Sequence, residues 1–189
     1  MRHATPIVTA LFLISSLAAN ADVVAVDFED NEITRGTWTW ESPISSNGCD
    51  FTTDGGLDNG GDGSDNGTTH IWGWDITMTC GGVFDLLSWD LAEDFQEVAF
   101  SPIIDLFYAD GTEWLGLVGG ALDGVFGFEN RFFFDSSIPT DLTAVRFYAE
   151  PGYAIALDNI RVAVPEPGTL ALLGIGFAGI GLARRRRKI

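Results

Sequence analysis

The sequence predicts an all-β fold, an antiparallel β-sandwich, placed between two apolar terminal segments. Between residues 22 and 164, short runs rich in β-branched and aromatic side chains alternate with clusters of Gly, Asp and Pro, the usual pattern of strands and turns. No long apolar stripe with helical period occurs there, and only residues 91–96 are expected to form a helical turn. The 189-residue chain is 46% apolar, which is enough for one packed core.

The strands are expected in regular succession, with turn signals between them and no helix intervening. The expected strands are residues 23–29, 37–41, 50–53, 70–79, 83–91, 98–101, 103–109, 113–118, 125–134, 144–149 and 154–164. Such an order favours two packed sheets of jelly-roll type, with a barrel as the alternative.

The first 21 residues have the features of a secretory signal peptide. Arg2 and His3 precede an apolar run over residues 7–17, and Ala19 and Ala21 fit a small-x-small cleavage site. The mature chain is then expected to start at Asp22. The apolar run is too short for a membrane span, which needs about 20 residues.

Export bears on the expected state of the two cysteines, Cys49 and Cys80. Disulfides persist outside the cytoplasm, so the pair is expected to form one, with two free buried thiols as the alternative. No Cys-x-x-Cys occurs, which argues against a redox or zinc site.

Residues 54–67, DGGLDNGGDGSDNG, combine glycine with acidic and amide oxygens and are expected to form a loop. The segment resembles single Ca²⁺-binding repeats only imperfectly, because Gly67 stands where one repeat needs an apolar residue and Gly73 where another needs Glu. A weak Ca²⁺ contact through Asp58, Asp62 or Asp65 is one hypothesis, and a solvated loop is the other.

The expected first and last strands contain Phe28-Glu29 and Leu157-Asp158-Asn159-Ile160. These residues resemble the ends of carbohydrate-binding-module jelly rolls, in which the first and last strands lie side by side. The resemblance implies that Asp27 or Glu29, together with Asp158, holds a structural Ca²⁺, an ion that prefers six to eight oxygen ligands. The alternative is a strand-end Asp-Asn pair that hydrogen-bonds a neighbouring turn.

Two tryptophan pairs are spaced i, i+2, so that each pair shares one face of a strand. The pairs are Trp38 with Trp40 and Trp72 with Trp74. We expect both pairs to pack in the core, because large aromatic side chains supply burial in a sandwich of this size. A pair that faces water would instead form a flat surface for stacking on sugar rings.

Charge and motifs exclude several function classes. Residues 22–164 carry 26 acidic side chains against four arginines, a formal charge of −22 that repels nucleic acid. The mature chain has one histidine, His70, and none of the motifs of serine hydrolases, zinc hydrolases or P-loop proteins. We therefore expect a protein that is not an enzyme.

The C-terminal segment VPEPGTLALLGIGFAGIGLARRRRKI has three parts: Pro165-Glu166-Pro167, an apolar stretch over residues 169–183, and a basic run. As a helix the apolar stretch spans about 22 Å, less than the ~30 Å of the bilayer core, which makes it a marginal transmembrane anchor. The basic run is expected to stay cytoplasmic and to set the orientation. It consists of Arg184, Arg185, Arg186, Arg187 and Lys188.

This order of parts resembles the PEP-CTERM sorting signal of Gram-negative bacteria. The resemblance implies recognition by an exosortase, cleavage near Pro165-Glu166-Pro167, and release or attachment at the cell surface. Proteins with this signal are associated with extracellular polysaccharide and biofilm.

Together these features predict a signal peptide at residues 1–21, an extracytoplasmic β-sandwich at 22–163 and a sorting signal at 164–189. The expected function is non-catalytic, at the surface or in the extracellular matrix, with an exosortase, a transient membrane anchor and polysaccharide as partners. The alternatives are a glycan-active hydrolase that uses an Asp/Glu pair and a purely structural matrix protein.

Overall fold

The fold is known from a computed structural model that describes residues 21–31, 37–40, 42–59, 68–94, 99–118, 121–124, 127–132 and 138–165. Of the sorting signal it describes residues up to Pro165. The expected signal peptide up to residue 20, the apolar stretch 169–183 and the basic run lie outside the described residues.

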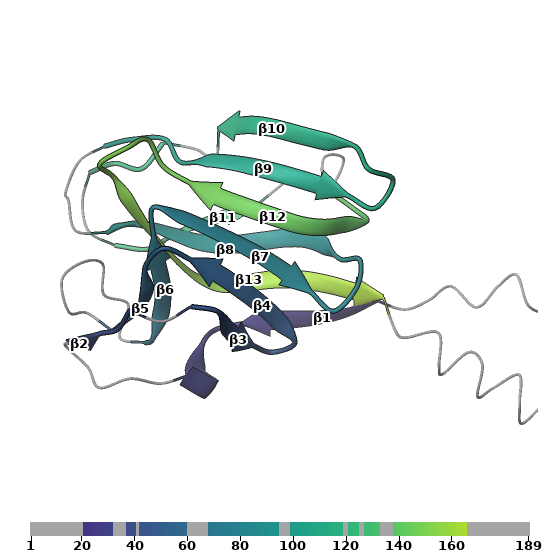
Figure 1. Cartoon of the computed structure of the whole chain (residues 1–189), viewed down its shortest axis with the longest axis horizontal. Helices are drawn as coiled ribbons and strands as arrows, with labels where there is room; N and C mark the ends of the chain where they lie inside the picture. Colours follow the sequence, from purple (N-terminus) through teal and green to yellow (C-terminus); the bar gives the residue numbers. More distant parts are fainter. Residues whose placement is uncertain are drawn as a thin grey trace, which may run out of the picture. The chain divides into compact units, whose positions relative to one another are not determined.

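The described residues form two antiparallel β-sheets, as the sequence predicts, and no α-helix (Figure 1). The strands are β1 Ala21–Val26, β2 Thr37–Trp38, β3 Ile44–Ser46, β4 Cys49–Thr53, β5 Gly56–Asn59, β6 His70–Gly73, β7 Asp75–Cys80, β8 Asp85–Asp94, β9 Ile103–Tyr108, β10 Glu113–Val118, β11 Glu129–Phe132, β12 Leu142–Tyr148 and β13 Ala154–Pro165. One 3-10 turn, η2, covers Glu29–Asn31.

One sheet has the strand order β11-β8-β13-β6-β5-β2, with β1 also paired to β13. The other has the order β10-β9-β12-β7-β4-β3. The first and last strands are thus neighbours, and both reach the same end of the sandwich (Figure 1). Val23–Val164 form one compact unit.

A single hydrophobic core lies between the sheets. Strands β4, β7 and β12 alternate buried, mostly apolar residues with more exposed, mostly polar ones, and β13 is buried over most of its length. Trp89 of β8 and Phe147 of β12 meet across the core with ring centroids 5.7 Å apart. Each fully buried side chain of this size contributes about 1.5–3 kcal/mol, so apolar burial holds the two layers together.

Several strand predictions are wrong in detail. Residues 70–79 form two strands, β6 and β7, which belong to different sheets and meet at a corner at Trp74. Residues 91–94, expected in a helical turn, continue β8. Residues 99–101 are not in a strand. The pattern of apolar residues is continuous through these positions, so it could not locate the corner.

Two strands were not predicted at all. Residues 56–59, part of the expected loop, form β5, whose residues are all buried. Strand β3 pairs with β4 through a two-residue turn, Asn47-Gly48, with φ of 47° and 81°. An Asn-Gly pair with both φ values positive is the preferred connection of a tight hairpin, so the signal for β3 was present in the sequence.

Candidate functional site

The four tryptophans of the two i, i+2 pairs meet in one group, which we call the tryptophan cluster: Trp38, Trp40, Trp72 and Trp74. The ring centroids of Trp40 and Trp72 are 4.8 Å apart at 71°, and those of Trp38 and Trp72 are 6.3 Å apart at 88°. Trp40 and Trp74 are stacked at 6.2 Å and 25°. Two segments that are distant in the sequence therefore build a single aromatic group.

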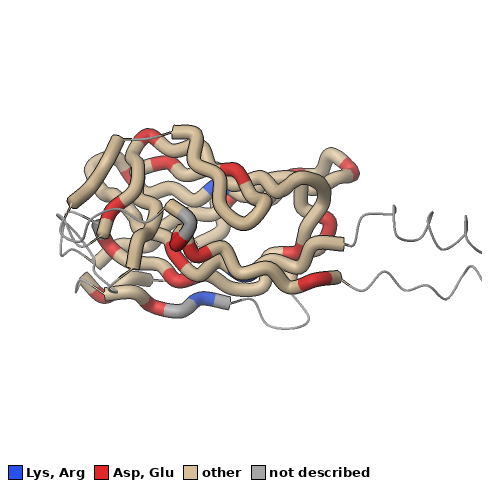
Figure 2. Tube along the Cα trace, turned by 90° about the horizontal axis from the view of Figure 1, so that it is seen from below, with Lys and Arg blue, Asp and Glu red and all other residues tan. Residues whose placement is uncertain are grey.

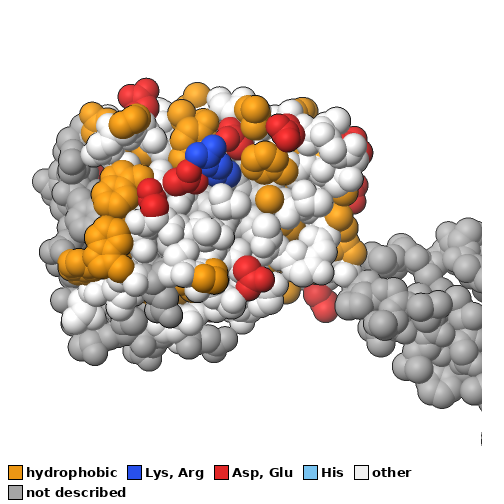
Figure 3. Space-filling model, viewed as in Figure 1, with side chains coloured by type: hydrophobic (Ala, Val, Ile, Leu, Met, Phe, Trp, Pro, Cys, Tyr) orange, Lys and Arg blue, Asp and Glu red, His pale blue; other side chains and the backbone are white. Residues whose placement is uncertain are grey.

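The cluster joins a buried base to an exposed rim. Trp72 is fully buried and Trp74 partly buried, whereas Trp38 is 41% and Trp40 61% exposed. Hydrophobic side chains gather at this end of the molecule, where Figure 1 places β2 and the start of β7 (Figure 3). The expectation that both pairs pack in the core is therefore wrong for Trp38 and Trp40.

Backbone packing around β6 fixes the base of the cluster. The Thr53 hydroxyl donates to the Trp72 carbonyl at 2.9 Å and accepts from the Gly55 N–H at 2.9 Å. A Cβ on Gly55 would lie 2.2 Å from the Trp72 carbonyl oxygen, and one on Gly73 would lie 2.2 Å from the Thr53 hydroxyl. A larger residue is obstructed at Gly55 by the backbone of Trp72 and Gly73, and at Gly73 by the side chains of Thr53 and Asp54.

A carboxylate holds the corner that carries Trp74. Asp54 Oδ1 accepts the backbone N–H groups of Trp74 and Asp75 at 2.9 and 3.0 Å. On the other side, β2 pairs Trp38 with Asp58, and the Thr39 N–H donates to the Leu57 carbonyl at 2.8 Å. These contacts attach the segments that carry the exposed indoles to the strands beside them.

Of the Ca²⁺ ligands predicted near the first and last strands, Asp27 and Asp158 accept hydrogen bonds from protein groups. Asp158 is buried and accepts from the Thr68 hydroxyl at 2.9 Å and from the Asn159 N–H at 2.7 Å. Asp27 accepts from the Asn47 amide at 3.2 Å, and Glu29 is exposed. This is the geometry of the alternative, in which Asp158 hydrogen-bonds a neighbouring turn.

Within the expected Asp-Gly loop, Asp58 is buried and lies 3.7 Å from the imidazole of His70, measured between Oδ2 and Nε2. Asp62 and Asp65 lie outside the described residues. In the part of the chain that the structure describes, no group of three or more His, Cys, Asp or Glu side chains is arranged to hold a metal ion. Ca²⁺ binding stays a prediction.

Cys49 and Cys80 form a disulfide between the paired strands β4 and β7. Both cysteines are buried, at 1% and 6% exposed. The two cysteines are separated by 31 positions in the sequence. In the chain-entropy model, closing a loop of this length stabilises the folded state by about 3–4 kcal/mol.

Acidic residues are spread over the whole sandwich, with few basic ones between them (Figure 2). On the outer face of β7, β9 and β12, Arg146 donates from Nε to Asp75 at 2.9 Å, and its Nη1 lies 3.6 Å from Asp105. Its guanidinium also lies over the Tyr148 ring at 4.6 Å, and the hydrogen bond to Asp75 raises the pKa of Arg146. The arginine thus pairs with two carboxylates on one face of the sandwich. Figure 3 shows basic atoms flanked by acidic side chains on this face.

Sequence reasoning missed a second aromatic pair, Tyr108 and Trp114, whose ring centroids are 5.8 Å apart. They flank the turn between β9 and β10, and Trp114 is 57% exposed. The available signal was an aromatic residue on each side of a short turn, Tyr108-Ala-Asp-Gly-Thr-Glu-Trp114.

Strand β13 leads directly into the predicted sorting signal. Val164 is partly buried against the core, and Pro165 is exposed at the end of the strand. Glu166 and Pro167 lie outside the described residues, as does Ala19 of the expected cleavage site, whereas Ala21 is the exposed first residue of β1. No helix among the described residues is long and apolar enough to cross a membrane.

Comparison with known proteins identifies the C-terminal segment. No curated protein matches the chain. A family model described as the PEP-CTERM protein-sorting motif matches residues 163–188. The chain therefore carries a PEP-CTERM protein-sorting motif, which implies export and exosortase-dependent sorting to the cell surface or a membrane-associated location.

Proposed function

We propose that the β-sandwich is a non-catalytic polysaccharide-binding protein of the cell surface or extracellular matrix, with the tryptophan cluster as its binding surface. The exposed indoles of Trp38 and Trp40, backed by the buried Trp72, carry this proposal. An indole face is apolar and flat while its N–H edge is polar, a combination suited to the C–H face and hydroxyl rim of a sugar ring. The sorting motif supports it by implying a place at the cell surface, where a protein can meet extracellular polysaccharide.

The test measures retardation of the full chain in native gels that contain neutral or acidic polysaccharides. Trp40→Ala should weaken binding about tenfold or more, because it removes the most exposed ring of the cluster. Trp40→Phe keeps an aromatic face, so it should lose less binding affinity than Trp40→Ala.

The matched control is Val23→Ala, because Val23 is also 61% exposed and lies on β1. Thermal unfolding of each variant verifies that the fold is intact. If no polysaccharide changes the mobility of the wild-type chain, only the alternative of a purely structural matrix protein remains. Repeating the gels with EDTA tests the predicted Ca²⁺, which should make binding sensitive to the chelator.

A further inference from the structure

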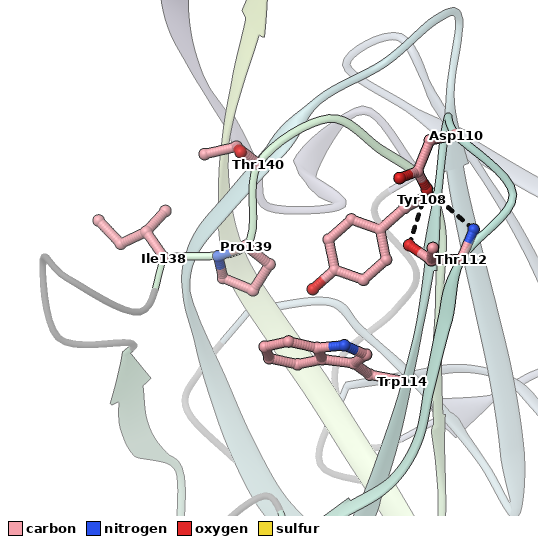
Figure 4. Close-up of a pocket in the computed structure, with 7 residues that line it drawn as sticks. All are labelled: Tyr108, Asp110, Thr112, Trp114, Ile138, Pro139 and Thr140. Atoms are coloured by element: carbon pink, nitrogen blue, oxygen red, sulfur yellow. Dashed lines mark hydrogen bonds between the residues drawn. The ribbon is translucent and has the colours of Figure 1, made fainter.

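A cavity of about 360 Å³ opens beside the β9–β10 hairpin, away from the tryptophan cluster. Its walls come from the hairpin, with Tyr108, Asp110, Thr112 and Trp114, and from the segment before β12, with Pro139 and Thr140 (Figure 4). The volume lies at the lower end of the about 300–1,000 Å³ that ligand pockets occupy, which corresponds to a small ligand or one unit of a polymer.

Two aromatic rings form the apolar part of this cavity. Trp114 and Tyr108 meet at an interplanar angle of 64°, so that their faces make two walls of a corner. The Tyr108 hydroxyl points into the space between Trp114 and Pro139 (Figure 4). A ring that lies on the indole therefore has a hydroxyl group beside its edge.

A carboxylate and hydroxyl groups form the polar part. Asp110 Oδ1 accepts from the Thr112 hydroxyl at 2.7 Å and from the Thr112 N–H at 2.9 Å. These two hydrogen bonds lower the pKa of Asp110, and the bond from the Thr112 hydroxyl has the larger effect. The pKa of Tyr108 is raised, mainly by burial and in addition by the negative charge of Asp110. At neutral pH the cavity thus offers an ionised acceptor and a protonated phenol that donates.

Backbone hydrogen bonds fix both walls. The Tyr108 N–H donates to the Thr112 carbonyl at 3.0 Å, and Gly111 completes the turn with φ of 84°. The Ala109 N–H donates to the Asp141 carbonyl at 2.9 Å, which joins the hairpin to the segment that carries Pro139 and Thr140. The cavity is therefore formed before a ligand arrives, which lowers the entropy cost of binding.

We propose that this cavity is a second glycan subsite, which holds one neutral pyranose ring on Trp114 with its hydroxyls bonded to Asp110 and Tyr108. The inference rests on the proposed polysaccharide binding and adds a site and a sugar class to it. Charge selects the class: the ionised Asp110 stands in a region of formal charge −22, which repels uronates and sulfated sugars.

This subsite is separate from the tryptophan cluster. Tyr148 is paired with both Asp75 and Ile103, so Trp74 lies level with the start of β9, whereas Tyr108 is at the end of β9. Five residues along a strand span about 17 Å, and β12 lies between β7 and β9. One sugar ring therefore cannot contact both sites, and a polysaccharide must extend over several units to reach from one to the other.

The experiment uses the full chain in a detergent whose headgroup is not a sugar, with a neutral glucan and polygalacturonate as probes in native gels. Trp114→Ala should lower the affinity for the glucan about tenfold, and Trp114→Phe should restore part of it. Leu115→Ala is the matched control, because Leu115 is 62% exposed on the same strand but does not line the cavity, and it should bind as the wild type does.

The outcomes separate the two proposals. A wild-type chain that binds neither probe overturns the proposed function and the subsite with it. Glucan binding that Trp40→Ala weakens while Trp114→Ala leaves it unchanged overturns the subsite alone. Binding to polygalacturonate but not to the glucan overturns the neutral sugar class.

Discussion

At the scale of single residues, Glu93 on β8 is a carboxyl group inside the protein, fully buried, whose Oε1 accepts the Gly124 N–H at 2.6 Å. Burial raises its pKa above the ordinary 4.5, the bond from Gly124 lowers it in part, and the charges of Asp123 and Glu129 raise it. The folded state thus binds this proton more tightly than the unfolded chain. The free energy of unfolding therefore falls as pH rises from the ordinary pKa through the raised one.

Glu93→Gln keeps an oxygen for the Gly124 N–H and removes the ionisation. We expect the variant to be more stable than the wild type at neutral pH, with a difference that vanishes near pH 4, measured as urea midpoints across this range. Glu113→Gln, at an exposed position of β10, is the control. A stability difference between Glu93→Gln and the wild type that is the same at pH 4 and pH 7 would contradict a raised pKa for Glu93.

The tryptophans show what single residues reveal in advance. The i, i+2 spacing of Trp38 and Trp40 identified a candidate aromatic surface, but exposure depends on which strands lie beside it. Strand β2 pairs only with β5 among the described strands and stands at the edge of its sheet, whereas β6 lies between β5 and β13. Which strand lies at the edge of a sheet and which at its centre is decided only when the strands pair. The sequence could therefore identify Trp38, Trp40 and Trp72 as candidates but could not predict how exposed each one is.

At the scale of strands, Gly55 and Gly73 allow the turn between β4 and β5 to lie close against the end of β6. Gly73→Ala would place a methyl group 2.2 Å from the Thr53 hydroxyl, which bonds the Trp72 carbonyl. We expect a loss of about 1–3 kcal/mol in the free energy of unfolding, the range for overpacked sites, measured by urea denaturation.

Gly81→Ala is the matched control, because a Cβ there has no neighbour within 4 Å. Its effect should stay within about 0.5 kcal/mol, as for most surface substitutions. Equal effects of the two substitutions would show that the close approach at Gly73 is not a constraint on stability.

The strand predictions succeeded where runs of apolar and β-branched or aromatic residues lie between clear turn signals, as in β9, β10 and β13. They failed where the physical cause is not local. Strand β5 has two glycines, Asp58 and Asn59 in or next to it, residues that disfavour strands, and it forms because β2 and β6 flank it. The corner at Trp74 depends on Asp54, twenty residues earlier.

At the scale of the whole molecule, the sorting motif implies exosortase-dependent sorting, and cleavage is expected near Pro165-Glu166-Pro167. Replacing Pro165, Glu166 and Pro167 together by alanine should leave a chain that still ends at Ile189 in a host with an active exosortase. In the same host the wild-type chain should be shortened near the motif. Intact-mass measurement of the variant and of the wild type distinguishes the two results. The same mass spectrum also tests whether the mature chain starts at Asp22, as predicted.

Pro151→Ala, at an exposed turn outside the motif, controls for the loss of a proline and should be processed as the wild type is. A wild-type chain that keeps its full C-terminus in that host would refute cleavage near the motif.

The pairing of Ala156 with Trp72 sets how far the tryptophans stand from the point where the chain leaves the sandwich. Pro165 follows nine residues later on the same strand, which is about 30 Å in extended conformation. Trp72 and its neighbours therefore lie roughly one small-domain length along the sheet from Pro165. Trp72 and Pro165 thus lie near opposite ends of β13, so the exposed indoles beside Trp72 are well separated from the start of the sorting motif within the sandwich itself.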